Sequence, residues 1–180
     1  LIAAAGNGAL VTIIDAENGN VAGQLKLSAP DVITTLQFSP DDRHLVIGQR
    51  NGVLTWFSTL DWATPEFDSS DVDDGINAAA FSPDSRVLAV ARSNESIQLF
   101  DGNTGALKSW TISVESVPLA LTYCEGGNVL AIGTSTGELQ LWDVATRSRR
   151  ASIKAHTSRI NALRVFPNGT TLASGGRDRR

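Results

Sequence analysis

The sequence predicts an all-β protein of the β-propeller class, made of four-stranded antiparallel blades and incomplete in this chain. Three observations predict this fold. Two independent series of similar segments recur with one common period of about 42 residues. Each period holds four short strand-like segments separated by turn residues, and no part of the chain shows helical periodicity. One such sheet cannot bury both of its faces, whereas sheets stacked around an axis cover one another.

The first series consists of alternating segments, of which Ile76 to Phe81 is the clearest. Its equivalent positions, separated by 43, 42 and 42 residues, are Phe38, Phe81, Tyr123 and Val165. The second series consists of strands whose polar end positions are separated by 43, 43 and 42 residues, at Asp15, Ser58, Asp101 and Asp143. Because both series have the same period, the period marks a structural unit.

Within one period the four strands follow from local signals. The alternating strand 76–81 must end before Pro83, because proline cannot continue a central ladder. A short apolar strand over 87–91 follows, and a tight turn leads to a third strand over 97–100. After a turn that is rich in Gly and Asn, a more polar outer strand is expected over 107–112.

This pattern divides the chain into five expected units. They are a partial blade over 1–32, three blades over 33–75, 76–117 and 118–158, and a partial blade over 159–180. The chain contains no methionine and begins in mid-strand, so we expect it to belong to a longer polypeptide. The alternative is a composite ring of four blades closed by the two terminal pieces. The sequence disfavours it, because both pieces contain the second strand.

The most specific residues are Trp142-Asp143, Ala155-His156 and the segment Leu172-Ala-Ser-Gly-Gly-Arg-Asp178. Through them the chain resembles the WD-repeat family over essentially its whole length. In that family a His, a Ser or Thr, an Asp and a Trp form a hydrogen-bonded structural network within a blade. The resemblance implies that His156, Ser174 and Asp178 fill three of these places, with the Trp expected about six residues after Asp178. We assign Trp142 and Asp143, the Trp-Asp pair of the preceding repeat, to the same structural class.

Elsewhere the repeats depart from the family pattern. The place of Asp178 is taken by Gly8, Asn51, Asn94 and Thr136 in the other units. We therefore expect packing to stabilise these blades more than buried polar networks do. The two Phe-Ser-Pro-Asp segments, at Phe38 and Phe81, also resemble the repeats of TolB-type periplasmic propellers. The Trp-Asp and Ala-His pairs favour the WD class.

Composition and charge argue against several functional classes. The formal net charge is −4, whereas nucleic-acid binding is driven by basic surfaces, so we expect no nucleic-acid partner. We interpret the arginines near the end (Arg147, Arg149, Arg150, Arg177, Arg179, Arg180) as solvated surface. No stretch approaches the roughly 18 apolar residues of a membrane span, so no membrane partner is expected. The single cysteine, Cys124, fits a small buried hydrophobe in a reducing compartment, and we expect a cytoplasmic location.

Several motifs look catalytic but have a structural explanation. Gly133 to Gly137 matches the nucleophile-elbow pattern, yet it falls between two strands and not between a strand and a helix. Asp71 to Gly75 lacks the twelfth-position Glu of a calcium loop, and we interpret Glu66 to Asp74 as a solvated acidic loop between blades. His44 is expected in an exposed turn with no second ligand at metal spacing. The sequence therefore predicts no catalytic residue, cofactor or metal, and the protein is not expected to be an enzyme.

The expected function is a non-catalytic protein–protein interaction scaffold within a larger WD-repeat protein, with other proteins or peptides as partners. Loops at one face of such a scaffold make the contacts in this family. The candidate partner-binding residues just before the place of Asp178 are Arg50, Ser93, Ser135 and Arg177. Arg159, near the start of an inner strand, is another candidate. Trp62 is a further candidate contact residue. The alternatives are a sensor or docking domain of a multidomain enzyme, such as a bacterial protein kinase or ATPase, and a TolB-like periplasmic propeller.

Overall fold

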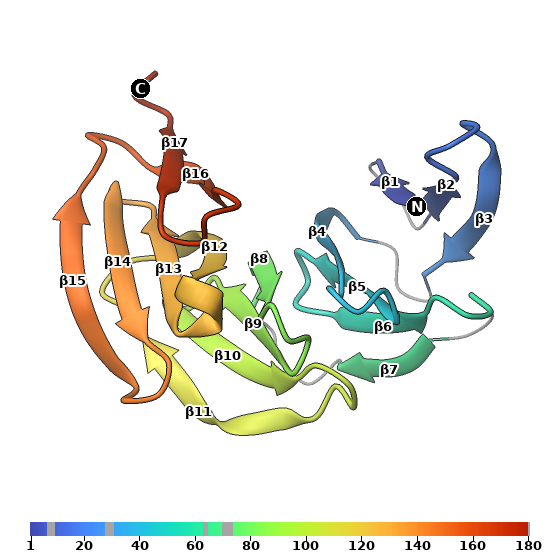
Figure 1. Cartoon of the computed structure of the whole chain (residues 1–180), viewed down its shortest axis with the longest axis horizontal. Helices are drawn as coiled ribbons and strands as arrows, with labels where there is room; N and C mark the ends of the chain where they lie inside the picture. Colours follow the sequence, from blue (N-terminus) through green and yellow to red (C-terminus); the bar gives the residue numbers. More distant parts are fainter. Residues whose placement is uncertain (7–9, 28–30, 63–64, 70–73, 180) are drawn as a thin grey trace.

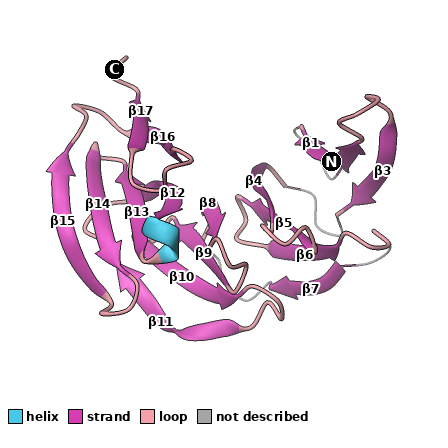
Figure 2. Cartoon of the chain, in the orientation of Figure 1, coloured by secondary structure: helices cyan, strands magenta, loops and turns pink. Residues whose placement is uncertain are grey.

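The described strands form five separate antiparallel sheets arranged in an open arc (Figure 1). The computed structural model describes residues 1–6, 10–27, 31–62, 65–69 and 74–179. Within them the secondary structure is strands and turns, with one short 3-10 turn, η1, over Glu125–Gly127 (Figure 2). The first sheet and the fifth sheet form the two ends of the arc, which does not close. The prediction of an all-β, incomplete propeller of four-stranded blades is confirmed.

The sheets follow the order of the chain. The first holds β1 (Ile2–Ala5), β2 (Leu10–Ile14) and β3 (Val21–Lys26). The second holds β4 (Ile33–Phe38), β5 (His44–Gln49), β6 (Leu54–Ser58) and β7 (Pro65–Ser69). The third holds β8 (Ile76–Phe81), β9 (Val87–Arg92), β10 (Ser96–Asp101) and β11 (Leu107–Ser113). The fourth holds β12 (Pro118–Cys124), β13 (Val129–Thr134), β14 (Glu138–Asp143) and β15 (Ser148–Lys154), and the fifth holds β16 (Ile160–Val165) and β17 (Leu172–Gly176).

Each complete sheet has the same sequential order, so its first strand lies nearest to the centre of the arc and its last strand lies outermost (Figure 1). One sequence-based expectation is wrong here. Residues 66–69 belong to β7, which pairs with β6, and not to a loop. The acidic residues of this segment have low strand propensity, but β6 offers them an open ladder at a sheet edge, where charge is tolerated. Residues 70–73, the rest of the expected loop, lie outside the described residues.

Turns between the first and second strands use the Ser-Pro-Asp sequence in the same way in two sheets. The Ser82 hydroxyl donates to an Asp84 carboxylate oxygen at 2.6 Å and accepts the Val87 N–H at 3.0 Å. Ser39 makes the same contact with Asp41, also at 2.6 Å. The hydroxyl donor lowers the pKa of both carboxyls. The serine thus closes the turn that the proline begins.

The apolar core lies between neighbouring sheets, with one cluster at each of the four junctions. Alternate residues of one strand serve two different clusters. In β5, Leu45 and Ile47 pack toward the first sheet, whereas Val46 packs toward the third. All three side chains are fully buried. The strand period of two therefore matches a sheet that is covered on both faces.

Candidate functional site

A repeated backbone hydrogen bond defines one edge of the arc. In each of the second to fifth sheets, the hairpin or turn after the second strand donates an N–H to the carbonyl oxygen of the residue just before the first strand. The four bonds, each 2.9 Å long, run from Arg50 to Val32, from Ser93 to Gly75, from Ser135 to Val117 and from Arg177 to Arg159. We call this edge, formed by these hairpins and connectors, the upper rim.

All five candidate contact residues lie on the upper rim. Arg50, Ser93, Arg159 and Arg177 are exposed, and Ser135 is half-buried. The Ser93 hydroxyl donates to the Gly75 carbonyl at 3.1 Å, which fixes its side chain. The rim therefore presents one residue at the same position of each hairpin on a rigid backbone.

Three of the residues assigned to the structural network meet at the end of the fifth sheet. The His156 ring is nearly buried, and its Nδ1 lies 2.8 Å from an Asp178 carboxylate oxygen. Its Nε2 lies 2.9 Å from the Ser174 hydroxyl. The other Asp178 carboxylate oxygen accepts the Thr157 N–H at 2.9 Å. These bonds clamp the connector after β15 onto the hairpin after β17.

Trp142 and Asp143 make separate contacts in the fourth sheet. The Trp142 indole N–H donates to Gln140 at 3.0 Å. Asp143 accepts the Thr146 N–H at 2.8 Å and a guanidinium N–H of Arg150 at 2.9 Å. The Thr146 amide and Arg150 lower the pKa of Asp143 to about 2. The structure therefore brings together His156, Ser174 and Asp178 and holds the Trp-Asp pair in a second group.

The sequence analysis missed Arg92, which is fully buried between the second and third sheets. Its guanidinium donates to the carbonyl oxygens of Gly52 at 2.8 Å and Asp74 at 3.1 Å, and its Nε donates to Gln98 at 2.9 Å. Burial lowers the pKa of this guanidinium. Three bonds to neutral oxygens compensate for the loss of water around the charge. Arg92 thus links the hairpin of one sheet to the strands of the next.

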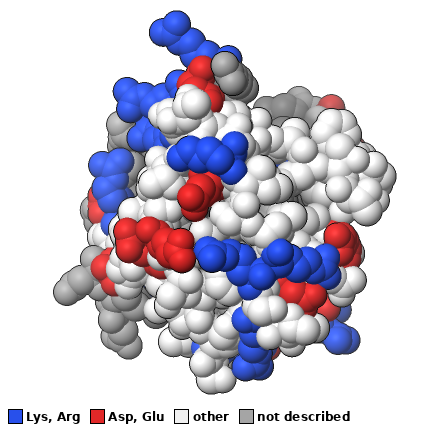
Figure 3. All heavy atoms as spheres, turned by 90° about the vertical axis from the view of Figure 1, so that its left-hand side faces the viewer, with Lys and Arg blue, Asp and Glu red and all other residues white. Residues whose placement is uncertain are grey.

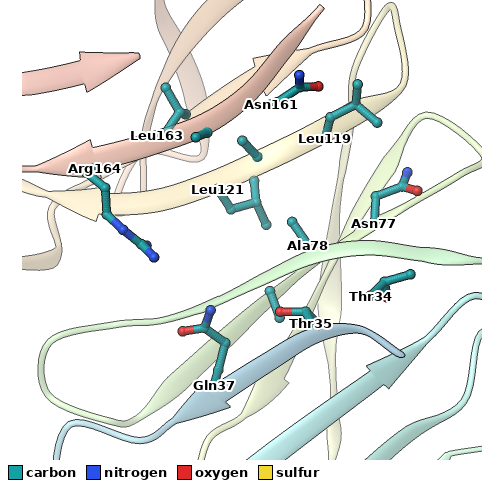
Figure 4. A pocket seen from close by; sticks show the side chains of 13 residues that line it. Thr34, Thr35, Gln37, Asn77, Ala78, Leu119, Leu121, Asn161, Leu163 and Arg164 are labelled. Carbon is teal, nitrogen blue, oxygen red and sulfur yellow. The ribbon is translucent and has the colours of Figure 1, made fainter. Parts of the chain in front are cut away.

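The inner strands line an open polar pocket of about 260 Å³ at the centre of the arc. Figure 4 shows amide and hydroxyl side chains around it, with Gln37 on β4, Asn77 on β8 and Asn161 on β16, and with Arg164 at one end. Asn77 donates to the Pro118 carbonyl at 3.1 Å. The lining offers hydrogen-bonding groups and one cation, and it lacks a paired acid and base.

The residues that suggested chemistry occupy structural places. Ser135 lies in the hairpin between β13 and β14, so the nucleophile-elbow pattern has no helix after it. His44 is the first residue of β5 and is half-buried, so the expectation of an exposed turn is wrong. Burial raises the pKa of the Cys124 thiol, which bonds to the Val129 carbonyl. Trp62 packs edge-on against Phe38, with ring centroids 6.4 Å apart.

The described residues contain neither a cluster of metal ligands nor a membrane-spanning helix. In that part of the chain, no group of three or more His, Cys, Asp and Glu side chains is placed to hold a metal ion. No helix there is long and apolar enough to cross a membrane. Gly8, the equivalent of Asp178 in the first unit, and Asp71 to Asp73 of the calcium-like segment lie outside the described residues.

Known proteins resemble this chain in sequence and in fold. The WD40 family model, described as "WD domain, G-beta repeat", matches residues 66–101 and 147–180. Transducin beta-like protein 3 of Bos taurus is 26% identical over 189 aligned positions, which cover 96% of this chain and 22% of that protein. WD repeat-containing protein srw1 of Schizosaccharomyces pombe is 39% identical over 59 residues, covering 33% of this chain and 10% of that protein.

A chain in the crystal structure of the mitotic checkpoint complex superposes with a TM-score of 0.84 at 19% identity. The match covers 94% of this chain and 52% of that chain. This chain therefore spans about a fifth of the bovine relative and half of the structural neighbour. The repeat match, the two relatives and the superposed propeller agree with one another, and together they support a WD-repeat β-propeller for this chain.

Proposed function

We propose that this chain is a non-catalytic scaffold in the cytoplasm that binds other proteins or peptides through its upper rim. The residues that make the contacts are Arg50, Ser93, Ser135, Arg159 and Arg177. The proposal assigns no catalytic residue and no cofactor to the chain. His156, Ser174 and Asp178 have a structural role in it.

The repeated 2.9 Å backbone bond is the observation that carries the proposal. It presents a side chain at the same position of four successive hairpins, so the exposed atoms of the rim keep fixed relative positions. Preorganised surfaces lose little conformational entropy when a partner binds. The relative named WD repeat-containing protein srw1 supports a repeat scaffold as the general role.

Site-specific photo-crosslinking tests the proposal. A photoreactive amino acid replaces Ser93 or Ser135 on the upper rim. Asn103 and Asn168, exposed residues in turns at the opposite edge of the third and fifth sheets, are the matched control positions. We expect discrete protein adducts from the two rim positions that disappear when Arg50 and Arg177 are replaced by Glu. Adducts of equal yield from the control positions would show that the rim is not the binding face.

A further inference from the structure

We propose that the upper rim of the fifth sheet binds a short acidic peptide through Arg159, Arg177 and Arg179, which we call the arginine rim. This inference rests on the proposed scaffold function and names the chemistry of one partner. It concerns the part of the rim where the connector before β16 meets the hairpin after β17.

The first support is the state of the basic side chains. Several cations elsewhere are engaged within the chain. Arg150 pairs with Glu125 at 2.9 Å and Arg149 with Glu115 at 3.6 Å, while Lys154 donates to the Thr136 carbonyl at 2.6 Å. Arg147 lies over the Trp110 ring, 5.4 Å from its centroid. Within the described residues, the three side chains of the arginine rim make no ion pair and are exposed.

The charge distribution gives a second support. Figure 3 shows basic and acidic side chains next to one another over the side formed by the outer strands, with basic side chains at the top, toward the end of the chain. Asp178 is the one carboxylate among the described residues 159–179, and its oxygens already accept bonds from Thr157 and contact His156. The arginine rim therefore keeps two net positive charges in a chain whose formal charge is −4.

The geometry holds these charges in one place. Arg177 donates its backbone N–H to the Arg159 carbonyl at 2.9 Å, so the connector and the hairpin that carry the arginines touch. The bonds of Asp178 to His156 and Thr157 fasten the same two segments a second time. A guanidinium can bind a carboxylate with two parallel hydrogen bonds. Preorganised guanidinium groups therefore fit two or three closely spaced Asp or Glu side chains.

The neighbouring rim favours a peptide over a nucleic acid. The hairpin of the fourth sheet lies beside the arginine rim, because the His156 N–H donates to the Gly137 carbonyl at 3.0 Å. It carries the half-buried Ser135 hydroxyl, which can bond to a peptide backbone. Nucleic-acid affinity depends on many phosphate contacts over an extended basic surface. A short acidic segment needs only the three arginines.

Fluorescence anisotropy with a labelled ten-residue Glu-Asp peptide tests the proposal on the full chain. We compare the triple variant Arg159→Gln, Arg177→Gln, Arg179→Gln with a control that replaces Arg43, Arg86 and Arg149 by Gln. The control removes the same charge from exposed arginines that already have acidic partners. The expected result is saturable binding by the native chain, weakened by salt, with a loss of about tenfold or more in the rim variant and less than about twofold in the control.

Arg177→Lys keeps the charge but not the paired N–H groups, so it should lose affinity by a few fold. No saturable binding by the native chain, or an equal loss in the control, would overturn the proposal. Preferential binding of a ten-nucleotide single-stranded RNA, lost in the rim variant, would also overturn it and assign the surface to nucleic acid. If rim crosslinks from Ser93 and Ser135 persist while the peptide fails to bind, the scaffold function stands and the acidic specificity is wrong.

Discussion

Replacing His156 with Ala tests how much one buried polar cluster contributes to the fifth sheet. The substitution removes the ring that contacts Asp178 at 2.8 Å and Ser174 at 2.9 Å. A hydrogen bond to a charged group contributes about 1.5 to 3 kcal/mol, and a neutral one about 1 kcal/mol. We expect local destabilisation of about 3 kcal/mol, which corresponds to about a hundredfold faster opening of β16 and β17.

Hydrogen exchange measured by mass spectrometry on peptides from residues 156–179 checks this value. The fourth sheet supplies a matched rescue. Register and backbone bonds place Val114, Ile132 and Thr136 where the fifth sheet has His156, Ser174 and Asp178. The triple variant His156→Val, Ser174→Ile, Asp178→Thr should recover to within about 1 kcal/mol of the native chain, because only the exposed N–H and hydroxyl of Thr157 then lose a partner. An exchange rate unchanged in His156→Ala, or a triple variant no more stable than it, would refute the reasoning.

Three further predictions concern single positions. Arg92→Met keeps the side-chain volume but leaves the carbonyl oxygens of Gly52 and Asp74 without this donor. Urea denaturation should therefore show a free energy of unfolding about 3 kcal/mol lower. A decrease below about 1 kcal/mol would contradict the role of this side chain. Gly137→Ala should destabilise the chain by more than about 2 kcal/mol, because the added Cβ would clash with two carbonyl oxygens of the connector after β15. Gly126→Ala is the control, since Gly126 has a similar positive φ but open space around it. This control should lose about 1 kcal/mol in the same assay. A hydrogen bond from Lys108 and, to a smaller extent, bonds from local backbone N–H groups lower the pKa of Asp101 to about 2. The stability that this carboxylate contributes is therefore present above the ordinary pKa of 3.8 and is lost as the pH falls from about 4 to 2. Acid titration followed by circular dichroism should show a smaller loss in this window for Asp101→Asn, and an identical pH profile would exclude the contribution.

The strands could be predicted from the sequence because turn residues interrupt apolar runs at fixed intervals. The Ser-Pro-Asp turns end β4 and β8 at the expected residues, since proline and the serine hydroxyl bond leave the chain little choice. The strand β7 could not be predicted in the same way. Its residues have weak local preference, and the open edge of β6 provides the ladder that makes them a strand.

The site was predictable where a residue keeps its repeat position and unpredictable where it does not. The positions of Arg50, Ser93, Ser135 and Arg177 follow from the period alone, because they are separated by 43, 42 and 42 residues. Arg92 gives no such signal. At the same register the other hairpins carry Gln49, Thr134 and Gly176, so only the neighbouring carbonyl oxygens explain why an arginine can be buried there.

Three junctions between the sheets each hold a bond to a hairpin carbonyl, which a side chain donates at one junction and a backbone amide donates at the other two. The Arg92 guanidinium donates to the Gly52 carbonyl. The backbone amides of Val114 and His156 donate to the carbonyls of Glu95 and Gly137. The repeats are therefore alike in shape but are not interchangeable parts. Exchanging two of them by recombination would set a buried guanidinium or imidazole against a neighbour that lacks its partner. At the junction of the second and third sheets, the buried side-chain bond therefore ties each repeat to the particular neighbour beside which it stacks.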